Sequence, residues 1–246
     1  MTGSAAKGAP GGPRRGCSHE TWQKEDIGRR ETMKKCVVLF SIAIFCCMAF
    51  VPGGVPGKTE KIALSKENPI QADVQGKIVS LLAEVNGKYL QQPTRHGVVF
   101  FKGKNGDKSV FRAYAGHKDL YDSLTKIGLK PGNNMTMDNK ETTFVQGDLL
   151  DVMVSWEGGK KAYRLDEVIS DSNKKPFQIR FGGNLQSALK HDTGCLLCLD
   201  SCPVGILSNA AYTYGAVEKR KEVEFRSNSG ILPKDGTPVV ITIKAK

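Results

Sequence analysis

The amino-acid sequence predicts a strand-rich α+β fold with a mixed, mostly antiparallel sheet. Short apolar runs separated by Gly-containing turns recur from residue 77 to residue 243, a pattern typical of strands joined by tight turns. Only one segment has the three- and four-residue spacing of an amphipathic helix. The strand–helix–strand repetition of a doubly wound parallel sheet is missing from the pattern.

The first expected strands are residues 77–85 and 88–90, which flank Asn86-Gly87. Asn-Gly between two apolar runs is a strong hairpin signal. Residues 96–101 and 109–114 form a second expected pair of strands.

One helix is expected over residues 118–127, where Leu120, Leu124 and Ile127 share a face and Gly128 marks the end. Partial alternation in Asp151-Val-Met-Val-Ser-Trp156 indicates a half-buried strand. The complete set of later strands is expected at residues 142–145, 149–156, 177–181, 221–225 and 239–243.

The N-terminal segment has the composition of a leader followed by an export signal. Residues 1–32 are rich in Gly, Pro, Arg and Lys, so we expect either a disordered leader or an untranslated stretch before Met33. Residues 33–57 combine a basic start, 16 uncharged residues at 36–51 and a Pro-Gly-Gly turn. That apolar run is shorter than the roughly 20 residues that span a bilayer, which favours a cleaved signal peptide over an N-terminal anchor.

This reading places the protein in the periplasm or cell envelope, with membrane association through residues 36–51 as the anchored alternative. Residues 58–246 are then expected to form a single domain. The net charge is +11, but the basic residues are scattered and no aromatic-interleaved basic stripe occurs. We therefore expect no nucleic-acid partner.

The most informative motif is Cys195-Leu-Leu-Cys198-Leu-Asp-Ser-Cys202-Pro203. It matches the last three cysteines of the bacterial ferredoxin run C-x₂-C-x₂-C-x₃-C-P. The first position of that run falls on Asp192. We expect a loop at residues 191–206 that projects between strands, with Cys195, Cys198 and Cys202 as metal ligands and Asp192 as the fourth ligand.

Three occupants of this loop remain open. An iron–sulfur cluster, such as a 4Fe–4S centre, is the first hypothesis because its iron binds thiolates. A zinc ion is the second, with Asp192 or His191 as the fourth ligand. The third is no cofactor, with a local disulfide and one remaining thiol, because an odd number of cysteines cannot pair completely. His96 and His117 are isolated in sequence and are expected to be surface or turn residues.

Three segments carry a family resemblance: Lys126-Ile-Gly-Leu-Lys-Pro-Gly132, Phe181-Gly-Gly-Asn184, and the cysteine run continued through Ser208-Asn209-Ala210. In this order they resemble the YdjY-domain family of exported bacterial proteins, over roughly residues 68–246. The resemblance implies export and supports the domain boundaries. It implies no particular activity.

Two functional hypotheses follow. The first is an exported iron–sulfur redox or electron-transfer module that works with a redox partner protein. The alternative is a non-catalytic binding or interaction domain of the cell envelope, in which the cysteines form a local disulfide or a structural zinc site.

Overall fold

The computed structural model describes residues 63–246, which form short strands and a few helices. The strands are β1 (Ile70–Asp73), β2 (Ile78–Val85), β3 (His96–Phe100), β4 (Ser109–Ala113), β5 (Leu150–Trp156), β6 (Lys161–Arg164), β7 (Ile169–Asp171), β8 (Ile179–Phe181), β9 (Cys195–Cys198), β10 (Leu207–Asn209), β11 (Phe225–Ser227) and β12 (Pro238–Ala245). The α-helices are α1 (His117–Lys126), α2 (Leu165–Val168) and α3 (Leu185–His191), and the 3₁₀ helices are η1 (Gly87–Leu90) and η2 (Glu157–Gly159). The leader and export signal expected at residues 1–57 lie outside the described residues. From residue 63 onward, no helix is both long and apolar enough to cross a bilayer.

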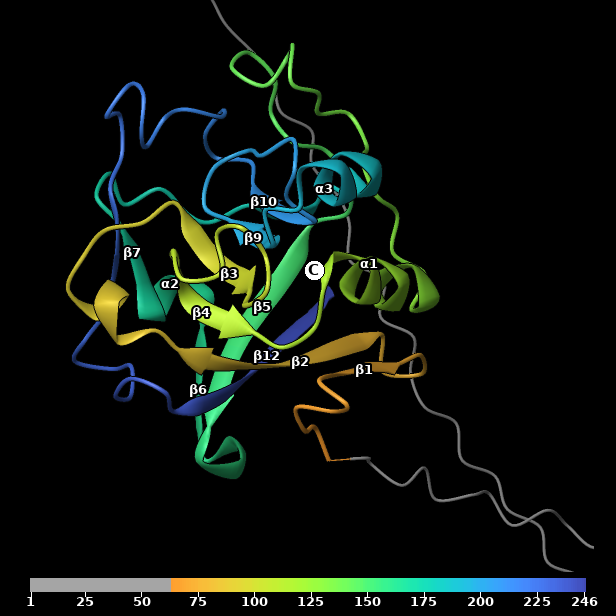
Figure 1. Ribbon diagram of the computed structural model, residues 1–246, viewed down its shortest axis with the longest axis vertical. Coiled ribbons are helices and arrows are strands. Elements are labelled where there is room, and N and C mark those ends of the chain that lie inside the picture. Colours follow the sequence, from red (N-terminus) through yellow and green to blue (C-terminus); the bar gives the residue numbers. More distant parts are fainter. Residues whose placement is uncertain (1–62) are drawn as a thin grey trace, which may run out of the picture. The chain divides into compact units, whose positions relative to one another are not determined.

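One large sheet dominates the architecture (Figure 1). Its strand order is β6-β5-β12-β2-β4-β3-β9-β10-β8, with β1 paired to β2 beside β4. The pairs β3–β4 and β9–β10 are parallel and the others are antiparallel. The mixed, mostly antiparallel sheet and the small number of helices were therefore predicted correctly.

The sheet is curved, so that β8 at the end of the strand order lies next to the start of β5. Leu149, just before β5, forms an isolated antiparallel bridge with Arg180 of β8. The backbone N–H of Phe181 donates to the carbonyl of Asp148 at 2.9 Å. This closure places the interior faces of distant strands around a shared core.

Alternation of buried and partly exposed residues produces the interior face of the long strands. In β2 every second residue from Val79 to Val85 is buried, and β5 and β12 have the same period. This is the pattern that a pleated strand with one face on the core requires. Strand β9 differs, because all four of its residues are buried.

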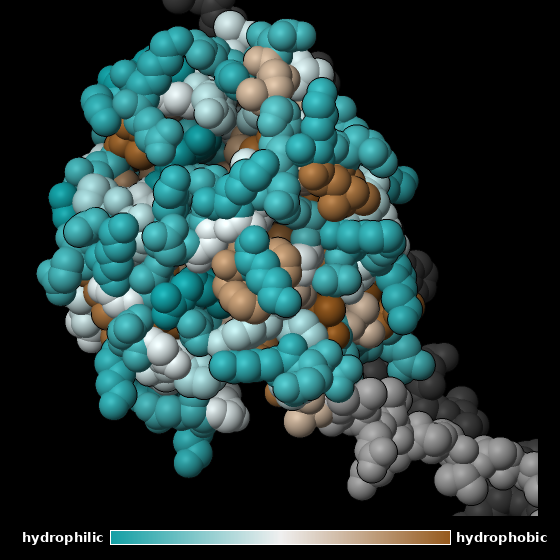
Figure 2. Space-filling view, viewed as in Figure 1, coloured by the Kyte–Doolittle hydropathy of each residue, from teal (hydrophilic) through white to brown (hydrophobic). Residues whose placement is uncertain are grey.

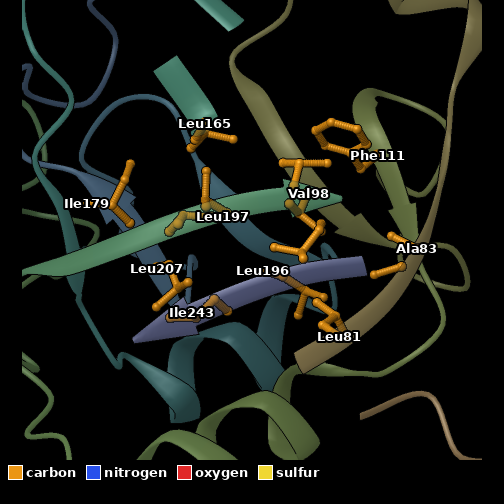
Figure 3. Close-up of a cluster of buried hydrophobic side chains, with 14 of the residues drawn as sticks. Leu81, Ala83, Val98, Phe111, Leu165, Ile179, Leu196, Leu197, Leu207 and Ile243 are labelled. Atoms are coloured by element: carbon orange, nitrogen blue, oxygen red, sulfur yellow. The ribbon is translucent and has the colours of Figure 1, made fainter. Parts of the chain in front are cut away.

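The core draws side chains from both halves of the chain. Figure 3 shows Leu196 and Leu197 of β9 among buried residues of β2, β3, β4, β10 and β12. The surface shown in Figure 2 is mostly hydrophilic, with apolar residues in small separate groups. Strand β9 is thus an interior strand of the sheet.

The expected projecting loop is not present. Cys195 and Cys198 begin and end β9, and the following turn with Cys202 is buried as well. The physical reason is the apolar pair Leu196-Leu197, whose burial requires the motif to enter the core.

Two strand predictions were wrong. Residues 88–90 belong to η1, because the carbonyl of Asn86 accepts the Tyr89 N–H at 3.0 Å and starts a tight turn. Residues 142–145 form no strand, since side chains satisfy their backbone: the Asn134 amide donates to the Phe144 carbonyl at 2.9 Å, and Ser201 Oγ accepts the Val145 N–H at 3.0 Å. The expected pair β3–β4 does form, but in parallel rather than as a hairpin. The strand expected at 221–225 begins only at Phe225, as β11.

Replacing Leu197 by Ala should lower the free energy of unfolding by about 2–5 kcal/mol, because the side chain is 1% exposed and its removal leaves a cavity. Urea unfolding measures this change. The matched control is Leu189→Ala, whose side chain is 47% exposed and whose loss should cost less than about 0.5 kcal/mol. Equal effects of the two substitutions would contradict the placement of β9 in the core.

Candidate metal centre

The three cysteines of the motif lie together in the protein interior. Cys195 and Cys198 come from β9 and Cys202 from the turn that follows, and each is at most 1% exposed. They form a small cluster of their own with Val204 packed against it. No disulfide joins them.

A histidine from β3 completes the group. Nδ1 of His96 lies 3.6 Å from Sγ of Cys195. The ligand atoms of His96, Cys195 and Cys198 all lie within 4.8 Å of one another. Cys202 is not among these three ligand atoms, but it packs in the same buried cluster as Cys195 and Cys198. The structure therefore gathers three sulfurs and one imidazole.

Irregular pairing between β3 and β9 allows this convergence. In a regular strand, residues three positions apart point to opposite faces of the sheet. The register of β9 against β3 shifts twice, between His96 and Val98 and again between Val98 and Val99. Such bulges redirect side chains. They account for Cys195 and Cys198 turning toward the same centre.

The three thiols differ in acidity. Hydrogen bonds from Cys198 and Cys202 lower the pKa of Cys195 well below its usual value, with smaller contributions from Thr193 and Asn105. The Asn105 amide nitrogen lies 3.8 Å from the Cys195 sulfur. Interactions with Cys195 and Cys202, together with burial, raise the pKa of Cys198. The interaction with Cys195 and burial also raise the pKa of Cys202, although Cys198 acts in the opposite direction. Cys195 is thus the first of the three to ionise.

A buried ion pair borders the thiols. A guanidinium nitrogen of Arg95 lies 2.5 Å from Oδ1 of Asp200, and both side chains are at most 6% exposed. Burial opposes the charge of Arg95, but Asp200, Cys202 and Cys198 outweigh it and raise the arginine pKa. Burial raises the pKa of Asp200 to about 6, against the effect of Arg95. A permanent cation therefore stands beside the cysteine cluster.

The imidazole of His96 is held in its neutral form. Burial, followed by the nearby charge of Arg95, lowers its pKa. Neutral imidazole is the form that binds a metal ion. The histidine is ready for coordination without first losing a proton at neutral pH.

One side of this group faces a cleft of about 390 Å³. Arg95 and His96 line it, whereas none of the three cysteines does. Within the described part of the chain, His96 is therefore the candidate metal ligand that also lines the cleft.

Asp192 lies apart from the gathered ligand atoms. It is exposed and caps the C-terminus of α3 in a left-handed conformation, with φ of 49°. Its carbonyl accepts the Lys104 N–H at 2.9 Å. His191, the other fourth ligand considered for zinc, ends α3 and does not belong to the group with convergent ligand atoms.

The prediction that His96 and His117 are surface or turn residues was wrong. Both are buried, His96 at the start of β3 and His117 in the first turn of α1. The weak signal in the sequence was an ionisable residue at the start of the apolar strand His96-Gly-Val-Val-Phe100. Nothing nearby in the chain pairs His96 with Cys195, which is 99 positions away.

Comparison with known proteins gives a consistent family assignment. The family model described as the YdjY domain matches residues 70–244. A protein of Escherichia coli (strain K12), named "Uncharacterized protein YdjY", is 54% identical over 187 residues, which cover 76% of this chain and 83% of the relative. No solved structure matches the chain.

His117 generates a prediction about acid stability. Its Nε2 is buried without a hydrogen-bond partner, and burial lowers the pKa. Because the unfolded chain takes up the proton more readily, stability should fall as pH drops below about 6.5, by up to about 1.4 kcal/mol per unit of lowered pKa. His117→Leu should flatten this loss in urea unfolding between pH 8 and pH 5. The half-buried His191, changed to Leu, serves as the control. An unchanged slope in His117→Leu would contradict the burial of a neutral imidazole.

Proposed function

This chain belongs to the YdjY-domain family, and we propose that it holds a single thiophilic metal ion between Cys195, Cys198, Cys202 and His96. Zn²⁺ suits this ligand set best. Three thiolates with one histidine are an established combination for a four-coordinate zinc ion. The proposal replaces Asp192 with His96 as the fourth ligand.

The separation of 3.6 Å between Cys195 Sγ and His96 Nδ1 carries the proposal. Tetrahedral zinc, with Zn–S of about 2.3 Å and Zn–N of about 2.0–2.1 Å, separates a sulfur and a nitrogen ligand by about 3.6 Å. Cys198 also has its sulfur within 4.8 Å of both atoms. Cys202 lies outside this group of three ligand atoms but belongs to the same buried cysteine cluster, so its side chain would have to move toward the ion to complete the tetrahedron.

The charges of the surroundings also support a metal. A zinc ion with three thiolates has a net charge of −1, which is costly to bury without a counter-charge. Arg95 is paired with Asp200, but its guanidinium also lies close enough to Cys198 and Cys202 to interact with their charges, so the positive end of this ion pair faces the thiolates. The amide of Asn105 donates toward the sulfur of Cys195, as outer hydrogen bonds do around thiolate ligands.

With four protein ligands the ion has no open coordination position, which is the arrangement of a structural zinc site. The ion would then connect β3, β9 and the turn at Cys202 at one point. We expect it to stabilise the fold, since metal binding free energy adds to folding free energy when the unfolded chain lacks the site.

A single iron ion in the same ligand set is the second candidate. The thiolate-rich set and the position of His96 at the cleft favour it, because a redox partner protein would reach the centre through the imidazole. A four-iron cluster fits less well. Its cysteines bind different iron atoms at the corners of the cluster, so their sulfurs stand further apart than ligands that share one ion.

Export is a separate proposal that rests on sequence. The basic start at Met33 and the uncharged residues 36–51 support a signal peptide or an anchor. A periplasmic or envelope location would expose free thiols to oxidants, and coordination by a metal would protect them.

Metal binding is tested by loading the full-length chain with Zn²⁺ and competing with a chelator of known affinity. We expect one ion per chain. Cys195→Ser and His96→Gln should each weaken zinc binding by at least about 100-fold, because each removes a direct ligand. The Co²⁺-loaded protein should show thiolate-to-metal absorption that decreases in the cysteine variant.

Asp192→Asn is the matched control and should leave zinc affinity unchanged, since the side chain is exposed and outside the cluster. A loss in Asp192→Asn equal to that in His96→Gln would contradict the ligand set. So would a wild-type chain that takes up no ion under reducing conditions.

The nature of the centre is tested by iron and sulfide analysis of protein purified without oxygen from cells that assemble clusters. A single-ion site predicts no acid-labile sulfide, whichever metal is bound. Iron and sulfide in similar amounts, each above two per chain, would establish a cluster and reject the single-ion proposal.

A further inference from the structure

The cleft beside His96 has the size of a small-molecule site. Its volume is about 390 Å³, within the range of about 300–1,000 Å³ that ligand pockets occupy. It lies between the entry to β3, with Thr94, and the segment that leads into β11, with Val223. The metal proposal assigns it no ligand.

Most charges that line the cleft are already paired. Arg95 is bound to Asp200. Glu222 pairs with Arg220 at 3.2 Å.

Glu224 pairs with Arg226. Glu218 is 64% exposed and lies 4.0 Å from Arg95, at the limit of an ion pair. The acidic side chains of the cleft therefore have cationic partners.

Two lysines in the same cleft have none. Lys108 and Lys221 both line it, and no acidic group in the described part of the chain lies within 4.0 Å of either ammonium. When each ion pair is counted as neutral, the remaining charged groups of the cleft are the two lysines and, at most, the carboxylate of Glu218. Its residual charge is positive.

The backbone fixes both lysines at the cleft. The Thr94 hydroxyl donates to the Lys108 carbonyl at 2.6 Å. Lys221 has a left-handed backbone with φ of 54°, which is a strained conformation for a residue other than glycine. The next residue anchors that conformation, since the Glu222 N–H donates to the Ala216 carbonyl at 2.8 Å.

The cleft also has an apolar wall. Tyr89 and Val223 are buried, and Val217 is half-buried; all three line the cleft. Pro93 adds a further apolar surface. Such a wall favours a ligand with a hydrocarbon or aromatic body.

We propose that this cleft binds a small organic anion, with its charged group between Lys108 and Lys221 and its apolar body against Tyr89 and Val223. A carboxylate and a phosphate share the chemistry that the two ammonium groups recognise. Contact between the bound anion and a metal-bound His96 rests on the proposed function, whereas the anion site itself does not.

The experiment follows backbone amide shifts of the isotopically labelled full-length protein during titration with three aromatic probes. Benzoate presents a carboxylate, phenyl phosphate a phosphate, and benzamide the same ring without charge. We expect at least one of the two anions to shift the amides of Lys108, Lys221 and Val223, with benzamide at least ten-fold weaker. The stronger anion identifies which charged group the cleft prefers.

Lys108→Gln and Lys221→Gln should each weaken anion binding several-fold, whereas Lys234→Gln, an exposed lysine outside the cleft, should not. Benzamide that binds as tightly as both anions, shifts elsewhere on the protein, or an equal effect of Lys234→Gln would overturn the proposal. Titrations of metal-free and zinc-loaded protein separate the two proposals. Anion binding in a protein that takes up no metal would reject the metal site and retain the anion site.

Discussion

The pairing of β9 with β3 is the contact on which the candidate metal centre depends. It connects two segments about a hundred residues apart and carries two register shifts within five residues of β3. Regular pairing would send Cys195 and Cys198 to opposite faces of the sheet. The bulged pairing brings both sulfurs to His96, while Leu196 and Leu197 of the same strand contribute to the core. Fold stability and site geometry are therefore coupled through one strand.

Burial then determines the chemistry of these side chains. An enclosed imidazole stays neutral, and one thiol of the three becomes acidic because its two neighbours donate to it. The Arg95–Asp200 pair is close to neutral overall, but its guanidinium end lies beside the cluster. These conditions favour an ion that binds soft ligands and a neutral histidine. Among the described residues that border the cysteine cluster, Arg95 and His96 are the ones that also line the cleft.

The sequence predicted the elements whose signal is local. Apolar runs bounded by turn residues identified β2 and β12, partial alternation supported β5, and the spacing of Leu120 and Leu124 located α1 to within one residue. The sequence of β9 does not distinguish it from a loop, because a four-residue strand buried on both faces shows no alternation. The cysteines were recognisable by their spacing, but His96 was not, since its relation to Cys195 exists only after β3 and β9 pair. The ferredoxin spacing predicts Asp192 as the fourth ligand because it assumes an uninterrupted loop. In the structure α3 ends at His191, and Asp192 caps that helix.

The most direct measurement of the central claim is X-ray absorption at the zinc K edge of the zinc-loaded, full-length protein. We expect three sulfur neighbours at about 2.3 Å and one nitrogen neighbour at about 2.0 Å, with no second metal nearby. The His96→Gln variant should lose the imidazole scattering and keep the sulfur shell. A coordination shell made mainly of oxygen, or one unchanged by loss of His96, would contradict it.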